Sequence, residues 1–193
     1  MNKETPRIRK EFQLWKACAK KGDNRNCLEY VCFDNGYAYA SDGHILAKVN
    51  VTTLALLPDP DEYVKLNGFC IHGDAMRLLA RYDNIEIVAD NGNLSIVCHI
   101  GKNTLTFGLT PKKEVNPPNF EAVLKAEGEH VPIEKIGIEK TFLNDLTDAI
   151  GQNRVKMDFY SESSKIIVTP INDDYLDVKG LIMPIMTTGT LDL

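Results

Sequence analysis

The sequence has no long apolar run, no zinc-like ligand spacing and no glycine-rich phosphate loop, and each absence excludes a class of function. No stretch approaches the ~20 apolar residues of a membrane span. The start Met1-Asn2-Lys3-Glu4 lacks the apolar core of a signal peptide. We therefore expect a cytoplasmic protein that makes no membrane contact. Because ligand clusters and phosphate loops are both missing, we also expect no cofactor and no metal site.

Paired cysteine motifs are also missing, since the five cysteines are odd in number and scattered and no Cys-x-x-Cys pair occurs. In a cytoplasmic chain such residues are reduced thiols that pack as small apolar side chains. We expect this state for most of the five, which are Cys18, Cys27, Cys32, Cys70 and Cys98.

Positive charge is also in short supply, since the formal net charge is -5 and argues against indiscriminate nucleic-acid binding. The charge is uneven, however, because residues 1 to 25 carry an excess of Lys and Arg. A basic N-terminal region on an acidic body fits a phosphate-facing surface, and it fits equally a solvated helix face with a mobile terminus.

The remaining composition, 44% hydrophobic and 25% charged, is ordinary for one large domain or two small ones. Three helix-plus-meander units follow one another, which predicts an α+β fold with one helix on each antiparallel meander. The helices are expected at 8–21, 75–82 and 142–150, the last closed by Gly151. The strands are expected at 30–33, 37–40, 45–49, 85–89, 94–99, 104–109, 133–138, 155–160, 165–169 and 181–185.

Turn chemistry supports these boundaries. Asp34-Asn35-Gly36 and Asp90-Asn91-Gly92-Asn93 are hairpin signals, and Asp74 is a plausible cap for the second helix. Residues 53–63, Leu-rich at first and then Pro58-Asp59-Pro60-Asp61, are expected to be a linker, and residues 110–130, with Asn116-Pro117-Pro118-Asn119, are expected to be loop-like.

The turn at Ala40-Ser41-Asp42-Gly43-His44-Ile45-Leu46-Ala47 holds a hydroxyl, a carboxylate and an imidazole within four residues. A hydrolase could use His44 with Ser41 or Asp42, or a metal could bind near His72 and His99. Contiguous strand residues point to opposite faces, however, and cannot form a catalytic relay. A structural turn is the favoured interpretation.

The same stretch resembles the Ala-Thr-Asp-Gly-His-Arg-Leu-Ala signature of bacterial DNA polymerase sliding clamps, the beta subunits of the replicative polymerase. Four further segments resemble that family in the same order, over residues 8 to 187. They are Arg25-Asn26-Cys27-Leu28 with Val31-Cys32-Phe33, Phe69-Cys70-Ile71 with the helix after it, Pro118-Asn119-Phe120-Glu121-Ala122-Val123-Leu124, and Leu181-Ile182-Met183-Pro184-Ile185-Met186.

The resemblance implies a non-enzymatic DNA clamp that tethers a polymerase or another client through a peptide held in an apolar groove. The groove residues carried over are Leu28, Ser41, Gly43, His44, Ile45, Leu46, Pro118, Val123, Leu181, Met183, Pro184, Ile185 and Met186. Helices that line a clamp's hole hold double-stranded DNA through non-specific phosphate contacts. The candidates here are Arg9, Lys10, Lys20, Lys21, Arg77 and Arg81.

Two departures from the family limit the inference. Ile45 and Met186 stand where the family has arginines, so the groove is expected to be more apolar. The three units amount to one and a half clamp domains: residues 1–125 resemble the middle domain, and residues 126–193 the end of the last. The missing half-domain should leave a sheet edge or face uncovered, and homo-oligomers form at such edges.

The third helix carries Asn144, Asp145 and Asp148 on its polar side, and carboxylates repel phosphate. Two hypotheses therefore stay open beside the hydrolase. One is a clamp that encircles DNA, and the other is a reduced clamp homologue that binds peptides as an adaptor or competitor without encircling DNA.

Overall fold

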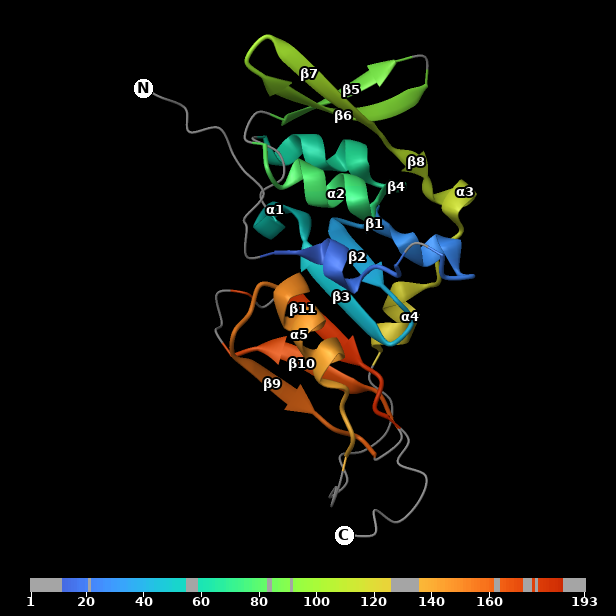
Figure 1. Cartoon of the computed structure of the whole chain (residues 1–193), viewed down its shortest axis with the longest axis vertical. Helices are drawn as coiled ribbons and strands as arrows, with labels where there is room; N and C mark the ends of the chain where they lie inside the picture. Colours follow the sequence, from blue (N-terminus) through green and yellow to red (C-terminus); the bar gives the residue numbers. More distant parts are fainter. Residues whose placement is uncertain are drawn as a thin grey trace.

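Three antiparallel meanders and a small number of short helices make up the computed structural model (Figure 1). The structure describes residues 12–20, 22–54, 59–82, 85–90, 92–125, 136–161, 164–171, 175 and 177–185. The first meander is β1 (Tyr30–Asp34), β2 (Tyr37–Ser41) and β3 (Ile45–Asn50). The second is β5 (Ile85–Asp90), β6 (Asn93–Ile100) and β7 (Asn103–Gly108), and the third is β9 (Val155–Asp158), β10 (Ile166–Pro170) and β11 (Val178–Ile182). The predicted α+β fold of helix-plus-meander units is confirmed.

The first and third meanders share one sheet. Its strand order is β8-β4-β1-β2-β3-β11-β10-β9, where β4 is Phe69–His72 and β8 is Thr110–Pro111. The second meander forms a separate sheet in the order β5-β6-β7. Strands β3 and β11 lie on opposite sides of the predicted domain boundary near residue 125 and are antiparallel neighbours. The two predicted domains stay a prediction, but their strands form one continuous sheet.

Helices cover both faces of the eight-stranded sheet. Helices α2 (Gly73–Leu79) and α5 (Lys140–Ala149) lie on one face, which we call the helix face (Figure 1). Helix α4 (Phe120–Leu124) packs on the opposite face, called the α4 face. The two-residue period of the strands divides the core accordingly. On β3, Ile45 packs into the cluster under α2 and α5, whereas its neighbour Leu46 packs into the cluster under α4.

Local sequence chemistry explains the hairpin that the sequence predicted between β1 and β2. Asn35 and Gly36 both have positive φ, 49° and 80°, as a two-residue hairpin turn requires. Gly151, with φ of 66°, follows α5 and ends that helix as predicted.

Five local predictions are wrong. The strand predicted at 181–185 lies three residues earlier, as β11. Of the strand predicted at 133–138, residues 133–135 lie outside the described residues, and 136–138 hold only an isolated bridge at Gly137. Within the described part of the predicted 8–21 helix, only a 3-10 turn is present, η1 (Leu14–Ala17). The N-cap of α2 is His72, whose ring nitrogen accepts a hydrogen bond from the Asp74 amide at 3.2 Å. Residues 110–130 include β8, α3 (Lys112–Val115) and α4, although no regular structure was expected there.

Three short helical segments complete the described chain: η2 (Asn26–Glu29), α1 (Val51–Leu54) and η3 (Pro60–Leu66). The last two lie within or beside the predicted 53–63 linker, of which residues 55–58 are outside the described residues. Among the residues that the structure describes, no helix has the length and apolarity needed to cross a bilayer.

Candidate functional site

The β2–β3 turn is held by its own polar side chains. Asp42 Oδ1 accepts hydrogen bonds from the amides of His44 and Ile45, each at 2.8 Å. Ser41 Oγ donates to the Ile45 carbonyl at 2.7 Å and accepts from the Gly43 amide at 3.1 Å. Gly43 has φ of 89°, a conformation that glycine adopts without strain. The hydroxyl and carboxylate that suggested a hydrolase therefore stabilise a turn, and no metal-binding cluster occurs among the described residues.

The turn lies beside the end of β11, as the resemblance implied. The Met183 amide donates to the His44 carbonyl at 2.8 Å, one step beyond the Ile45–Ile182 pair. On the helix face, the His44 ring stacks on Phe142 of α5, with centroids 4.8 Å apart and planes within 11°. Two segments that are far apart in sequence, 40–47 and 181–185, are thus brought together.

The predicted groove residues divide into a buried and an exposed group. Leu28, Ser41, Ile45, Leu46 and Leu181 are buried, so they support the surface without facing solvent. The exposed group consists of Gly43, His44, Pro118, Val123, Met183 and Ile185, with Pro184 half-buried. Met186 lies outside the described residues. Only the exposed group can contact a bound peptide.

Three of the exposed residues are large and apolar: Val123 at 39%, Met183 at 39% and Ile185 at 43% exposure. We call these three residues the apolar rim. Lys165, one step beyond the Ile166–Ile182 pair, donates from Nζ to the Val123 carbonyl at 2.7 Å. This bond brings the C-terminal end of α4 to Lys165, which precedes β10 and lies opposite Met183. The rim residues therefore come from two segments that meet on the α4 face.

Helix α4 is fixed on the sheet by aromatic and charged contacts that the sequence prediction missed. Phe120 stacks on Tyr39, with centroids 5.3 Å apart and planes within 7°. Glu121 Oε1 accepts from the Tyr39 hydroxyl at 2.5 Å and from Lys48 Nζ at 2.6 Å. Burial and the bond to Glu121 raise the pKa of Tyr39, whereas hydrogen bonds from Lys48 and Tyr39 lower the pKa of Glu121. The carboxylate therefore stays ionised beside a neutral phenol.

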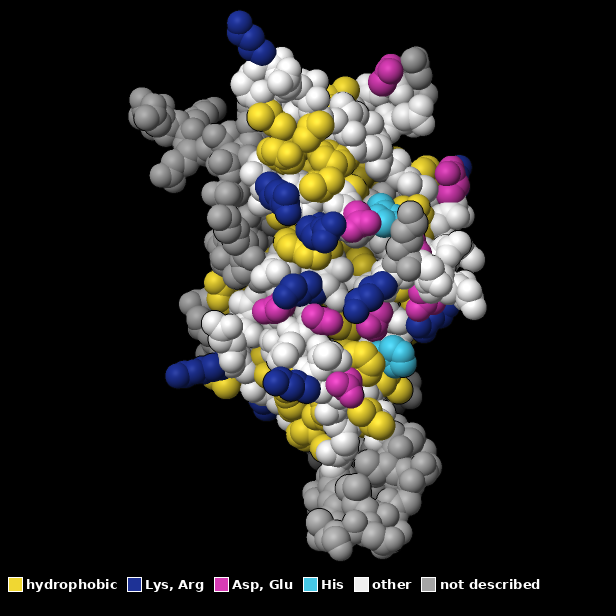
Figure 2. Space-filling view, in the orientation of Figure 1, with side chains coloured by type: hydrophobic (Ala, Val, Ile, Leu, Met, Phe, Trp, Pro, Cys, Tyr) yellow, Lys and Arg dark blue, Asp and Glu magenta, His cyan; other side chains and the backbone are white. Residues whose placement is uncertain are grey.

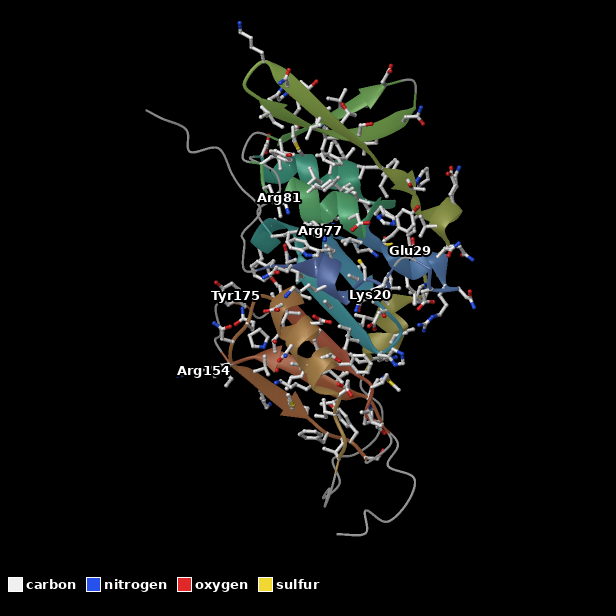
Figure 3. The ribbon with its side chains drawn as sticks, viewed as in Figure 1. Lys20, Glu29, Arg77, Arg81, Arg154 and Tyr175 are labelled. Atoms are coloured by element: carbon white, nitrogen blue, oxygen red, sulfur yellow. The ribbon has the colours of Figure 1, made fainter. Side chains whose placement is uncertain are left out.

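The helix face carries the basic residues that were predicted to meet DNA. Lys20, Arg77 and Arg81 lie in one diagonal row on this face (Figure 3). All three are exposed, while Arg9, Lys10 and Lys21 lie outside the described residues. Arg77 Nη2 lies 3.3 Å from Asp74 Oδ1. Lys20 and Arg81 have no ion-pair partner in the part of the chain that the structure describes.

Acidic residues interrupt this row, as Figure 2 shows for the whole face. An open cavity of about 580 Å³ between η1, α2 and α5 is lined by Lys16, Lys20 and Arg77, but also by Glu29, Asp74 and Asp145. Lys16 Nζ forms an ion pair with Asp148 at 2.5 Å, which neutralises one of the two carboxylates that α5 presents. The helix face is therefore mixed in charge, with unpaired cations at Lys20 and Arg81.

No protein-family model matches the sequence, and no curated protein matches it. Solved structures do match. The DNA polymerase III subunit beta from Pseudomonas aeruginosa is 16% identical, with a TM-score of 0.58, over 96% of this chain and 68% of that chain.

Two other organisms give similar matches. Caulobacter crescentus pol III beta is 16% identical, with a TM-score of 0.60, over 90% of this chain and 62% of that chain. The DNA polymerase III beta chain from Streptococcus pneumoniae is 14% identical, with a TM-score of 0.60, over 97% of this chain and 66% of that chain. The chain thus spans about two thirds of the length of these subunits. It has the fold of the bacterial DNA polymerase III beta sliding clamps.

Proposed function

We propose that this chain is a non-enzymatic tethering factor of DNA replication or repair, which contacts double-stranded DNA on its helix face and a client peptide on its α4 face. The observation that carries the proposal is the difference in chemistry between the two faces of one sheet. Lys20 and Arg81, which have no ion-pair partner among the described residues, lie on the helix face. The apolar rim of Val123, Met183 and Ile185 belongs to segments on the α4 face. A tether needs two separate surfaces of this kind.

On the DNA side, lysine and arginine contact phosphates without reading sequence, and each contact releases counterions. Asp145 and the net charge of -5 weaken the attraction. The proposed contact is therefore weak, independent of sequence and strongly sensitive to salt. Such binding suits a protein that must slide along its DNA.

On the client side, the rim supplies aliphatic and thioether groups that adapt to different apolar anchors. His44 borders the rim through its carbonyl bond to the Met183 amide. The client is a DNA polymerase or another enzyme that acts on DNA, held by a short extended segment. Localisation in the cytoplasm follows from this role.

Encirclement of DNA requires more than one copy. Identical chains close a ring through head-to-tail contacts, and the described part of the chain leaves several strand edges without a neighbour, among them β9 and β7. We propose that copies of this chain meet at these edges. Residues 1–125 and 126–193 correspond in this proposal to one clamp domain and a half-domain.

DNA binding is tested by fluorescence anisotropy with a labelled duplex at several salt concentrations. Lys20→Glu with Arg81→Glu is expected to weaken binding by about tenfold or more and to reduce the salt slope by about 2. The matched control is Lys113→Glu on α3, away from the row, which should leave binding unchanged. Equal losses in both variants would remove the helix face as the DNA surface.

Client binding is tested separately by calorimetry with a short clamp-binding peptide. Met183→Asp places a charge in the apolar rim without touching the core, and it should abolish the binding. Retention on closed circular DNA, with release after linearisation, then decides whether the chain encircles DNA. Peptide binding without any DNA binding would instead favour the adaptor hypothesis.

A further inference from the structure

A second cleft on the α4 face has no role in the proposed tether. It lies between α4 and strands β3 and β11, with a volume of about 590 Å³. We call it the lysine cleft, because Lys48, Lys125 and Lys179 line it together with Asn119, Glu121, Ala122 and Leu124. Three ammonium groups share the cleft with a single carboxylate.

Two of the lysines are placed directly against each other. Lys48 of β3 and Lys179 of β11 are antiparallel register partners, so their side chains leave the same face of the sheet at neighbouring positions. Like charges in this arrangement destabilise a sheet. Lys48 has a structural role, because it holds Glu121 of α4, but Lys179 adds a second positive charge beside it. A charge whose position costs stability is typical of a binding site.

Of these two lysines, only Lys48 forms an ion pair with a described neighbour. Lys48 Nζ donates to Glu121 Oε1 at 2.6 Å and lies 3.8 Å from the centre of the Tyr37 ring. Lys125 and Lys179 form no ion pair with any residue that the structure describes. Among the described residues, two ammonium groups of the cleft therefore lack an ion-pair partner, and Lys179 is only partly balanced by the nearby Glu121 carboxylate.

The shape and lining indicate which anion fits. Ala122 and Leu124 add an apolar wall, and the aliphatic stems of the lysines extend it. None of the lining side chains is aromatic, so the cleft offers no platform on which nucleic-acid bases could stack. A peptide combines carboxylates with apolar groups at the spacing of one or two residues and matches this lining.

We propose that the lysine cleft binds an acidic segment of a protein partner, whose carboxylates pair with Lys125 and Lys179. The complementary charge identifies the occupant, and the apolar wall holds the backbone and small side chains between the carboxylates. This contact adds a second protein-binding surface to the α4 face, on the flank of α4 that faces Lys48. It depends neither on DNA nor on the apolar rim.

The proposal is tested by fluorescence anisotropy with a fluorescein-labelled peptide of Glu-Asp-Ala repeats, and with a Gln-Asn-Ala peptide as the neutral probe. The native chain should bind the acidic probe in a salt-dependent manner and the neutral probe at least about tenfold more weakly. Lys125→Gln with Lys179→Gln should reduce affinity for the acidic probe by about tenfold or more. The matched control, Lys102→Gln with Lys113→Gln, should change it less than about twofold.

A stability measurement separates a binding role from a structural one. Lys179→Gln removes the like-charge pair without adding a second carboxylate beside Glu121, so it should raise the urea midpoint of unfolding while it weakens binding of the acidic probe. A lower midpoint would show that Lys179 supports the fold and would overturn the proposal. Equal losses for the acidic probe in the matched control would overturn it as well.

Two further measurements distinguish peptide binding in the lysine cleft from DNA binding on the helix face. Lys20→Glu with Arg81→Glu should leave binding of the acidic peptide intact even if DNA binding is lost. If Lys125→Gln with Lys179→Gln instead abolishes binding of a DNA duplex and spares the acidic peptide, the cleft is a nucleic-acid site and the peptide proposal fails.

Discussion

Gly180 of β11 sets the distance between the sheet and α5, and its replacement by alanine tests the packing of the third unit. A Cβ at this position would lie 2.8 Å and 2.9 Å from Leu146 Cδ1 and Cδ2, and 3.1 Å from Cγ. Because Cγ and both methyl groups are too close, exchange of the two methyl positions cannot clear the contact, and either Leu146 takes another rotamer in the packed core or α5 shifts. Overpacking of this kind costs about 1–3 kcal/mol, and the smaller entropy of the unfolded alanine chain offsets about 0.4–1 kcal/mol. We expect Gly180→Ala to lower the free energy of unfolding by about 1–2 kcal/mol.

The assay is a double-mutant cycle by urea denaturation. Leu146→Ala alone creates a cavity in the buried core and should cost about 2–5 kcal/mol. In the double variant, the new Cβ fills part of that cavity. The double variant should therefore be destabilised by about 1 kcal/mol less than the sum of the two single variants. Gly108→Ala is the matched control, since a Cβ there meets nothing within 4 Å. Full additivity, or a loss in the control as large as in Gly180→Ala, would refute the packing argument.

Three further outcomes follow from local contacts. Cys27 is half-exposed and should react first with a thiol reagent, while the four buried cysteines should react only on denaturation. Burial raises the pKa of Cys98 to about 11, which also disfavours its reactive thiolate. A stoichiometric titration of the thiols checks this order. Glu121 has a pKa below its ordinary value of 4.5, so the stability it contributes is present above that value and is lost as pH falls through the lower folded-state pKa. Urea midpoints of Glu121→Gln should therefore change less with acidification, and profiles parallel to the native chain would contradict the role of this carboxylate. Gly43→Ala should lower the free energy of unfolding by about 1 kcal/mol because of the positive φ at this position. The new Cβ would also meet the Arg25 guanidinium, but that side chain is flexible and can move away. Adding Arg25→Ala should therefore not restore the lost stability in the same urea assay.

The parts of the fold that the sequence predicted well are those with local causes. The Asn35-Gly36 hairpin follows from two residues that tolerate positive φ, whatever the rest of the chain does. The strands of the second meander follow from two-residue periodicity, clearest in β6, flanked by turn residues. In the third meander β10 and β11 are buried on both faces and carry no such alternation, and β11 lies three residues before the predicted 181–185 strand. Helix α5 follows from a three- to four-residue apolar spacing that ends at Gly151.

The parts that were missed depend on distant contacts. Helix α4 has only five residues, which is too short for a periodic signal, and its stability comes from Tyr39 and Lys48 on strands that precede it by about 70 to 80 positions. The segment around Leu14–Ala17 has helical spacing but packs as a single 3-10 turn against α2 and α5. Sequence spacing could not distinguish these two cases.

The candidate groove shows the same limit at single residues. Ile45 and Leu46 are adjacent, and the resemblance assigned both to one groove. In the structure they point to opposite faces, and both faces are covered, the first by α5 and the second by α4. A strand with one solvated face would have left one of them exposed. In the proposed peptide site, both residues therefore act only indirectly, through the position of the β2–β3 turn and the end of β11.

The pairing of β3 with β11 determines both proposed surfaces of the α4 face. In the observed register, Ile182 packs on the helix face and Leu181 under α4. Alternation then places Lys179 in the lysine cleft on one side of Leu181 and Met183 in the apolar rim on the other. A slip of one residue would put Lys179 into the helix-side core, where an unpaired ammonium is strongly disfavoured. The cost of that burial restricts β11 to one register, so the core that holds the third unit on the sheet also fixes the positions of the proposed client surface and of the proposed acidic-peptide cleft.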